Sequence, residues 1–464
     1  MRLKTISNGT AFAVFLVMVG AMLCPLRTVL ASPSLLCQSI IEYNLAAYQK
    51  SLSDGSYNGA EGILYIRPEP ARSLGLSVFM NQDYVAASNA EAEAAQLFDE
   101  MVSALTTRAP ETVRGEHAKR AGESAVARKE ALAAARRHFA AYRSKLTPRV
   151  DERLNREACL RIMEDLLEES LGRASFNLRE GLGIFYNRRL GLDEDAPPLT
   201  PENVRFVNHV FSKFQEKGSK EDKRRFDLGK QDQNGGTDPE VSLKETLDRE
   251  APRLAGLIRS CPDLLKTGGY PVDGRLFAAL MKRESNFDPH AVSCVGAAGL
   301  TQIMPQTGKG LGMKQIHLPA YFEEAMSLLK RERSLRKKAL SLMSGVTRAN
   351  MVKKAELARR YMQDSLACSR KRSELFARYR KELVQQNQDD RLDPCKAIAY
   401  GYRYFSDLMR MHKGDISLAL AAYNAGPHRV KQYNGLPPYA ETVTFRNTVL
   451  NYYREYLKKP KRAE

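Results

Sequence analysis

The sequence of 464 residues lacks the patterns that mark most metal-dependent and nucleotide-dependent proteins. Its seven histidines form no HExxH pattern, and its seven cysteines show no CxxC spacing typical of a zinc site. It has no GxSxG turn of a serine hydrolase, and the glycine-rich segment 308–312 fits neither a Walker A loop nor a dinucleotide fingerprint. We therefore expect no metal and no cofactor.

Long hydrophobic runs and short repeats are also missing. No repeat with a period of roughly 20 to 50 residues is apparent, and the apolar stretch 11–24 is shorter than the roughly 20 residues of a spanning helix. Arg2 and Lys4 precede that stretch, and small residues at 29–31 follow it. This pattern predicts a secretory signal peptide over 1–31, with an uncleaved membrane anchor as the alternative. We expect an exported protein of the periplasm or cell envelope.

The formal charge is +18, which would attract an anionic polymer. Nucleic acid is the first partner that such a charge suggests. However, the basic residues are dispersed among Glu and Ala at helical spacing, which equally fits a solvated basic helix surface. Because the export signal places the chain away from nucleic acid, we expect no nucleic-acid partner.

The length allows two or three domains. Residues 38–215 are rich in Ala, Glu, Arg and Leu, and apolar residues recur at helical spacing in 90–105 and 129–142. We predict a mainly α protein with a helical accessory domain over 32–215, a polar linker over 216–245 and a second domain over 246–464. A basic helical insertion is expected at about 316–390. The accessory domain could bind a ligand, pack on the second domain or meet a partner.

Six cysteines remain if Cys24 leaves with the signal peptide, and an oxidising compartment would permit them to pair. We predict at least one disulfide, with Cys37–Cys159 and Cys368–Cys395 as candidate pairs. Connectivity itself cannot be read from a sequence.

Glu284 is the candidate acid. After Asp273, a plausible N-cap, four apolar residues share one helical face and the same spacing brings Glu284 onto it. Pro289 ends this helix region, since proline disfavours helical geometry in the residue before it. A carboxyl group among apolar side chains has a raised pKa and can donate a proton near neutral pH. Alternatively, Glu284 is a buried cap that bonds a neighbouring Arg or backbone amide.

A second helix is expected after Asp415, with Ile416, Leu420 and Tyr423 on one face and Gly426-Pro427 as its end. Tyr423 and Asn424 then lie at the end of a helix. There the phenolic hydroxyl could reach a catalytic carboxyl, or Tyr423 could be a core tyrosine whose hydroxyl is satisfied.

Three ordered segments resemble the motifs of the soluble lytic transglycosylase family. The first, 284–307, reads ESNFDPHAVSCVGAAGLTQIMPQT; the second, 421–430, reads AAYNAGPHRV; the third joins Leu-Pro-Pro at 436–438 to Glu-Thr at 441–442. The resemblance covers roughly 254–307 and 394–457. It departs from the family pattern at Thr301, where Met is usual, and at Val443, where Arg is common.

The resemblance implies a lysozyme-like catalytic domain at the C-terminus, with Glu284 as acid/base. It also implies a glycan site. Its expected members are Ser293, Gln302, Met304, Tyr423, Asn424 and Glu441. From the residues alone, Ser293 could equally serve a turn and Met304 the core.

The activity that the resemblance implies is cleavage of the MurNAc–GlcNAc β-1,4 bond of peptidoglycan, with formation of a 1,6-anhydro-MurNAc end. A hydrolytic muramidase and a non-catalytic module that binds the cell wall remain alternatives. The expected partners are peptidoglycan glycan strands and a cell-envelope protein, the latter through the N-terminal domain or the insertion.

Overall fold

The computed structural model of the protein describes residues 34–108, 113–175, 177–193, 195–229, 238–261, 263–265 and 269–458. The predicted signal peptide therefore lies outside the described residues. Within these ranges, no helix combines the length and the apolar character that crossing a membrane requires.

The predicted mainly α fold class is confirmed. Among the described residues, β pairing is limited to isolated bridges, two of which join Val292 to Ala298 and Ala298 to Ile303. These two bridges lie in the segment 292–303.

The N-terminal half is helical, as predicted, and ends close to the expected limit of the accessory domain. Its helices, with the short helix that follows them, are α2 (Leu35–Asp54), α3 (Pro68–Ser73), α4 (Gln82–Thr106), α5 (Arg114–Arg143), η2 (Glu152–Leu154), α6 (Arg156–Arg173), α7 (Leu178–Arg189), α8 (Val204–Lys217) and α9 (Lys220–Arg224).

The C-terminal half begins inside the predicted linker, at Pro239. Its helices are α10 (Pro239–Glu250), α11 (Pro252–Ile258), α12 (Gly274–Ser285), α13 (Pro305–Leu311), α14 (Ala320–Ser344), α15 (Met351–Gln386), α16 (Pro394–Met411), α17 (Ile416–Ala425), α18 (Pro427–Gln432) and α19 (Ala440–Leu457). The expected insertion is a long hairpin, α14–α15. The domain limits themselves stay a prediction.

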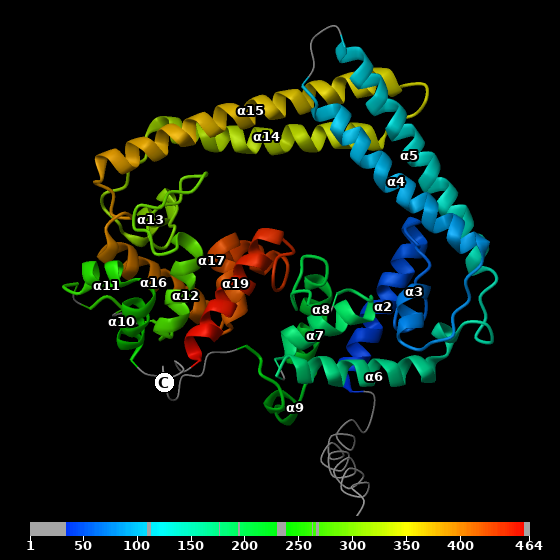
Figure 1. Ribbon diagram of the computed structural model, residues 1–464, viewed down its shortest axis with the longest axis horizontal. Helices are drawn as coiled ribbons and strands as arrows, with labels where there is room; N and C mark the ends of the chain where they lie inside the picture. Colours follow the sequence, from blue (N-terminus) through cyan, green and yellow to red (C-terminus); the bar gives the residue numbers. More distant parts are fainter. Residues whose placement is uncertain are drawn as a thin grey trace, which may run out of the picture.

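The helices form a closed ring (Figure 1). Two long hairpins, α4–α5 and α14–α15, arch over a central opening and meet at their outer ends. There, small and apolar residues from both hairpins form one buried cluster that includes Leu105, Ala121, Met343 and Ala358. We call this contact the hairpin joint.

A second contact closes the ring at its base, where one continuous hydrophobic core contains residues of both halves, among them Phe206 and Phe277. Ion pairs flank this core: Arg179 with Asp415, and Arg454 with Glu180, each at 2.6 Å. We call this contact the base joint. The N-terminal half therefore packs on the C-terminal half, one of the three roles that the sequence left open.

The prediction of at least one disulfide is confirmed, but both predicted pairs, Cys37–Cys159 and Cys368–Cys395, are wrong. The structure has a disulfide between Cys261 and Cys395, whose Cα atoms lie 5.9 Å apart, while Cys37, Cys159 and Cys368 are buried free thiols. The Cys159 thiol donates to the Arg153 carbonyl at 3.3 Å. Tertiary packing decides these pairs, because it brings the start of α16 to the segment after α11.

Removing this disulfide should destabilise the protein. It closes a loop between residues 134 positions apart, so the double variant Cys261→Ser/Cys395→Ser is expected to lose about 2–4 kcal/mol of unfolding free energy. Denaturant titration measures the loss. Exposed Cys294 offers a matched control, since Cys294→Ser should leave the midpoint unchanged. Peptide mapping under non-reducing conditions that linked Cys368 to Cys395 would contradict the assignment.

Candidate active site

Helix α12 carries the candidate acid. The Asp273 side chain accepts from the Arg275 backbone N–H and caps the start of the helix, as predicted, and six consecutive residues, 276–281, are fully buried. The helix ends at Ser285, and Asn286 takes the left-handed conformation (φ 50°). Glu284 therefore projects from the last turn, at the point where the chain turns away.

The carboxyl of Glu284 is poor in polar partners. No hydrogen bond or ion pair to it occurs within the described ranges, so the alternative of a buried cap is not what the structure shows. Burial of the carboxyl raises the pKa of Glu284 to about 8; the charge of Arg283 lowers that pKa, and the charge of Glu441 raises it. At neutral pH the group is therefore mainly protonated and can act as an acid.

Tyr423 lies close to this acid. Burial raises the pKa of Tyr423 well above its usual range, and the charge of Glu284 is the next largest cause. The Tyr423 hydroxyl donates to the Thr301 carbonyl at 2.7 Å, and its ring packs 5.3 Å from the ring of Tyr404. The phenol thus remains protonated and joins α17 to the loop before α13.

Asn424 and Glu441 link the second and third motifs. The Thr442 hydroxyl donates to the Asn424 side-chain oxygen at 2.7 Å, which fixes the end of α17 against the start of α19. Glu441 is exposed in the first turn of α19. It acts on Glu284 through its charge and makes no direct bond to it.

Ser293 and Gln302 are engaged within their own loop. The Ser293 hydroxyl accepts from the Ala297 N–H at 2.9 Å, and the Gln302 amide donates to the carbonyls of Ala291 (3.0 Å) and Gly299 (2.9 Å). Gln302 also has a left-handed backbone (φ 47°). These contacts agree with the turn role considered for Ser293, and a glycan role for either residue stays a prediction.

Met304 is partly buried and packs against a cluster that includes Ala298, Phe322 and Tyr379. Phe322 lies in α14 and Tyr379 in α15, so the base of the inserted hairpin supports the motif loop. This packing agrees with the core role considered for Met304, and a wall for the glycan stays a prediction.

Two residues that hold the loop were missed at the sequence level. The Ser285 hydroxyl donates to the Leu300 carbonyl at 2.9 Å, and the buried Arg391 guanidinium donates to the carbonyls of Gly296 (3.1 Å) and Ile303 (3.2 Å). Ser285 follows Glu284 in the first motif, so a signal existed. Arg391 lies more than 80 residues away in the sequence, and no motif marked it.

Comparison with known proteins identifies this region. A family model described as "Transglycosylase SLT domain" matches residues 266–344 and 373–443. These residues of the C-terminal half are therefore similar to the transglycosylase SLT domain. The stretch that the family model leaves unmatched, 345–372, is the outer part of the α14–α15 hairpin and includes its turn.

Curated relatives match over short segments. The chain is 38% identical over 68 residues to membrane-bound lytic murein transglycosylase F of Aeromonas salmonicida, covering 15% of this chain and 14% of that protein. It is 44% identical over 50 residues to a transglycosylase of Enterobacteria phage PRD1, covering 11% and 19%. The chain thus spans less than a fifth of the length of the curated relatives it matches.

Two solved structures are also similar. The soluble lytic transglycosylase SLT70 of Escherichia coli matches at 16% identity and a TM-score of 0.24, over 98% of this chain and 75% of that one. An inactive mutant of the lytic transglycosylase Slt of Pseudomonas aeruginosa matches at 15% identity and a TM-score of 0.24, over 97% and 76%.

The raised pKa of Glu284 predicts the alkaline limit of activity. A reaction that uses the Glu284 proton should become slower above about pH 8, as the acid loses that proton. Glu441→Gln removes a charge that raises this pKa, so the midpoint of kcat/KM should move to lower pH. Glu455→Gln, an exposed change at the other end of α19, is the matched control. An unchanged midpoint in Glu441→Gln would contradict the electrostatic coupling.

The same pKa predicts a pH-dependent gain in stability for Glu284→Gln. The carboxyl ionises near pH 4.5 in the unfolded chain and near pH 8 in the folded one. Below pH 4.5 it is protonated in both states and does not change the free energy of unfolding. Between pH 4.5 and pH 8 it lowers the free energy of unfolding, and this loss grows with pH. The variant should be equal to wild type at pH 4 and more stable at pH 7, by on the order of 2 kcal/mol. Thermal unfolding at both pH values tests this; equal differences at both would refute it.

Proposed function

We propose that the protein cleaves the MurNAc–GlcNAc β-1,4 bond of peptidoglycan and leaves a 1,6-anhydro-MurNAc end, with Glu284 as the catalytic acid/base. The observation that carries this proposal is the unpartnered carboxyl at the end of α12, whose pKa of about 8 keeps it protonated. The family of the domain supports the substrate class.

A single carboxylate suffices for this reaction. Ordinary glycosidases use two, one as acid and one as nucleophile or base. Here Asp288 is exposed beyond the end of α12, and Glu441 is exposed on α19, so neither shares the burial of Glu284. We assign neither of them a second catalytic role.

In the proposed reaction, Glu284 gives its proton to the oxygen between the two sugars as the bond to C1 breaks. The muramic acid N-acetyl oxygen stabilises the positive charge at C1 from within the substrate. Glu284 then accepts the proton of the same sugar's 6-hydroxyl as that oxygen closes on C1. The acid is regenerated, the product is the anhydro end, and no water is consumed. Tyr423 lies close to the acid, and Tyr423 and Asn424 at the end of α17 would orient the glycan.

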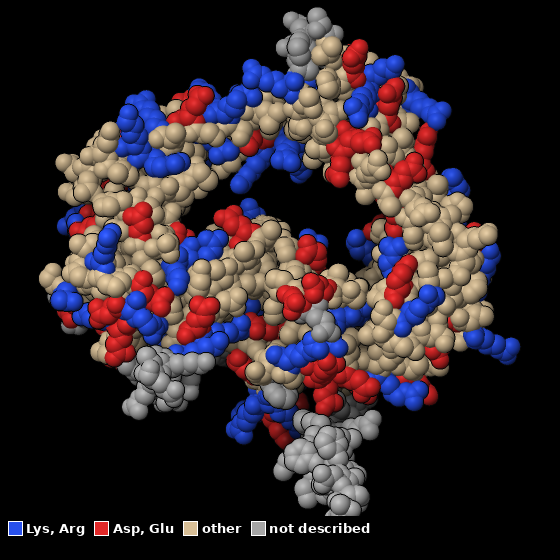
Figure 2. Space-filling view, in the orientation of Figure 1, with Lys and Arg blue, Asp and Glu red and all other residues tan. Residues whose placement is uncertain are grey.

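The charge distribution agrees with an anionic wall polymer as partner. Lys and Arg are interspersed with Asp and Glu over most of the face in Figure 2, and basic side chains gather over α14, which carries Arg333, Arg336 and Lys337. We propose that the protein is exported and acts on glycan strands in the cell envelope. An envelope protein as a further partner rests on the sequence-based expectation alone.

Mass spectrometry of peptidoglycan digests tests the proposal. The mature protein should release anhydromuropeptides, and Glu284→Gln should reduce their rate of formation by at least about a thousandfold, since it removes the proton donor and acceptor. Asp288→Asn, a carboxylate change just beyond the same helix, is the matched control and should retain activity. Products one water heavier, with reducing ends, would establish a muramidase. Binding without cleavage by wild type would favour the wall-binding module.

A further inference from the structure

The N-terminal half contains a second version of the loop that follows the candidate acid. Residues 59–68 read GAEGILYIRP, and residues 296–305 of the first motif read GAAGLTQIMP. The backbones match as well. The paired φ angles are 85° and 89° for Gly59 and Gly296, 72° and 76° for Gly62 and Gly299, and 48° and 47° for Tyr65 and Gln302. Left-handed conformations at non-glycine residues are uncommon, so agreement at Tyr65 and Gln302 is informative.

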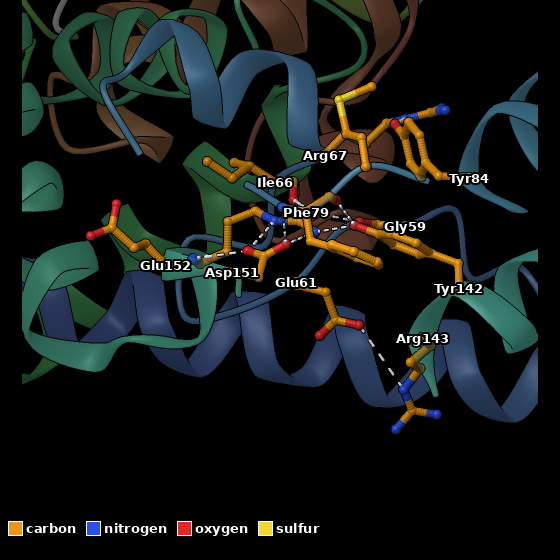
Figure 3. A network of polar contacts seen from close by, with 12 residues as sticks. Gly59, Glu61, Ile66, Arg67, Phe79, Tyr84, Tyr142, Arg143, Asp151 and Glu152 are labelled. Carbon is orange, nitrogen blue, oxygen red and sulfur yellow. Dashed lines mark hydrogen bonds and ion pairs between the residues drawn. The ribbon is translucent and has the colours of Figure 1, made fainter. Parts of the chain in front are cut away.

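A buried arginine holds each loop in the same way. Arg153 donates to the carbonyls of Gly59 (2.7 Å) and Ile66 (3.0 Å) and pairs with Asp151 and the Tyr142 hydroxyl, as Figure 3 shows for these partners. Arg391 makes the same contacts with the second loop. Its partners are Gly296, Ile303, Asp389 and Tyr379. The segments that carry the two arginines, 151–155 and 389–393, read DERLN and DDRLD.

The order of elements around the loops is also the same. Each loop leads into a short helix that begins with proline, then into a long hairpin, then into the arginine segment and three matched helices; the short helix α18 of the C-terminal half lies outside this match. The matched pairs are α3 and α13, α4–α5 and α14–α15, α6 and α16, α7 and α17, and α8 and α19. Residues 201–210 and 440–449, which open the last pair, read PENVRFVNHV and AETVTFRNTV.

The two halves contact each other reciprocally. At the base joint, Asn208 of α8 donates to the Leu436 carbonyl, and Asn447 of α19 donates to the Leu199 carbonyl, both at 2.8 Å. Asn208 and Asn447 occupy the same place in the matched segments. In an isologous contact, residue i of one unit meets residue j of the other and the reverse also holds. Equivalent side chains of the two halves therefore act as donors across the base joint, each toward the other half.

The counterpart of the acid is an amide. Helix α2 buries the positions that correspond to the 276–281 face of α12, namely Leu36, Cys37, Ile40 and Ile41. With the same spacing, the residue of α2 that corresponds to Glu284 is Asn44. Asn44 is fully buried. An amide has no proton to give at neutral pH, so this position cannot serve as a general acid.

An arginine side chain occupies the second centre, which is the region around Asn44 that corresponds to the surroundings of Glu284. Arg189 is 3% exposed; its guanidinium donates to the Asn44 side-chain oxygen at 2.6 Å and to the Leu64 carbonyl at 3.0 Å. Leu64 corresponds to Thr301, whose carbonyl receives the Tyr423 hydroxyl in the C-terminal half. The counterpart of Tyr423 is Tyr186, and its ring lies 4.8 Å from the Arg189 guanidinium carbon. Arg189 thus binds the counterpart of Glu284 and also the carbonyl that corresponds to the one bound by Tyr423.

We propose that residues 34–217 are a degenerate second copy of the transglycosylase domain, so that the chain is a fused pseudo-dimer with one open and one closed centre. The copy serves as a fixed partner: it closes the ring through the base joint and the hairpin joint and takes no part in cleavage. The inference that residues 34–217 are a second copy depends on the matched loops, arginine networks and helix order. The inference that this copy is inactive rests on the proposed role of Glu284.

Substitutions at Asn44 in the full mature chain test the closed centre. Asn44→Ala removes one acceptor from the buried Arg189 and leaves a cavity beside it, so Tm should fall by roughly 5 °C or more, while kcat for the anhydro product per folded molecule changes less than twofold. Asn44→Asp keeps the acceptor for Arg189 but loses the amide donor to the Ile63 and Leu64 carbonyls, so it should restore Tm only in part. A tenfold fall in kcat at unchanged Tm, or residual cleavage in Glu284→Gln that Asn44→Ala removes, would overturn the proposal.

A matched pair tests the equivalence of the halves. Tyr142→Phe and Tyr379→Phe remove the same hydroxyl from the two arginine networks and should lower Tm by similar amounts, roughly 2–4 °C each. Only Tyr379→Phe should lower kcat/KM, because its loop carries Gln302. Loss of kcat/KM in Tyr142→Phe to the same extent would refute a silent copy. An inactive wild type with both Tm shifts intact would instead refute the proposed function alone.

Discussion

The buried guanidinium of Arg391 organises the C-terminal half. A charged group removed from water is costly unless its partners replace its hydration, and Arg391 is fully supplied by one carboxylate, one phenol and two backbone carbonyls. Those carbonyls belong to Gly296 and Ile303, which bracket the loop of the first motif. The glycine turns of the loop, the base of the inserted hairpin and the start of α16 therefore meet at a single cation.

Glu284 shows the opposite arrangement. It has no partner of opposite charge in contact among the described residues, and burial of its carboxyl raises its pKa so that the proton is retained. The surrounding groups have their hydrogen bonds elsewhere: Ser285 with the Leu300 carbonyl, Tyr423 with Thr301, Gln302 within its loop. Because these partners are internal, the loop is held rigid without neutralising the acid. The groups that hold the loop are thus different from the carboxyl that retains its proton.

The local features of this site could be predicted from the sequence, because each depends on neighbours along the chain. The caps at Asp273 and Asp415, the end of α12 and the burial of its apolar face follow from spacing and from proline and glycine. The Cys261–Cys395 disulfide and the hold of Arg391 on the loop depend on long-range packing, which spacing does not encode. The second copy shares loop residues and caps but few helix residues, and its acid position had changed to Asn44, so no motif drew attention to it.

The hairpin joint has a consequence for biosynthesis. Arg359 of α15 bonds the Thr107 carbonyl across 252 positions, and Lys129 of α5 bonds the Val346 carbonyl across 217. During translation, the part of α4–α5 that forms the hairpin joint is synthesised long before the residues of α14 and α15 that cover it. A growing chain with an uncovered apolar face is prone to association. Most of the joint's buried residues in α4 and α5 are alanines, at 104, 118, 121 and 125. Their small side chains limit the apolar area that is exposed until α14 and α15 have been synthesised.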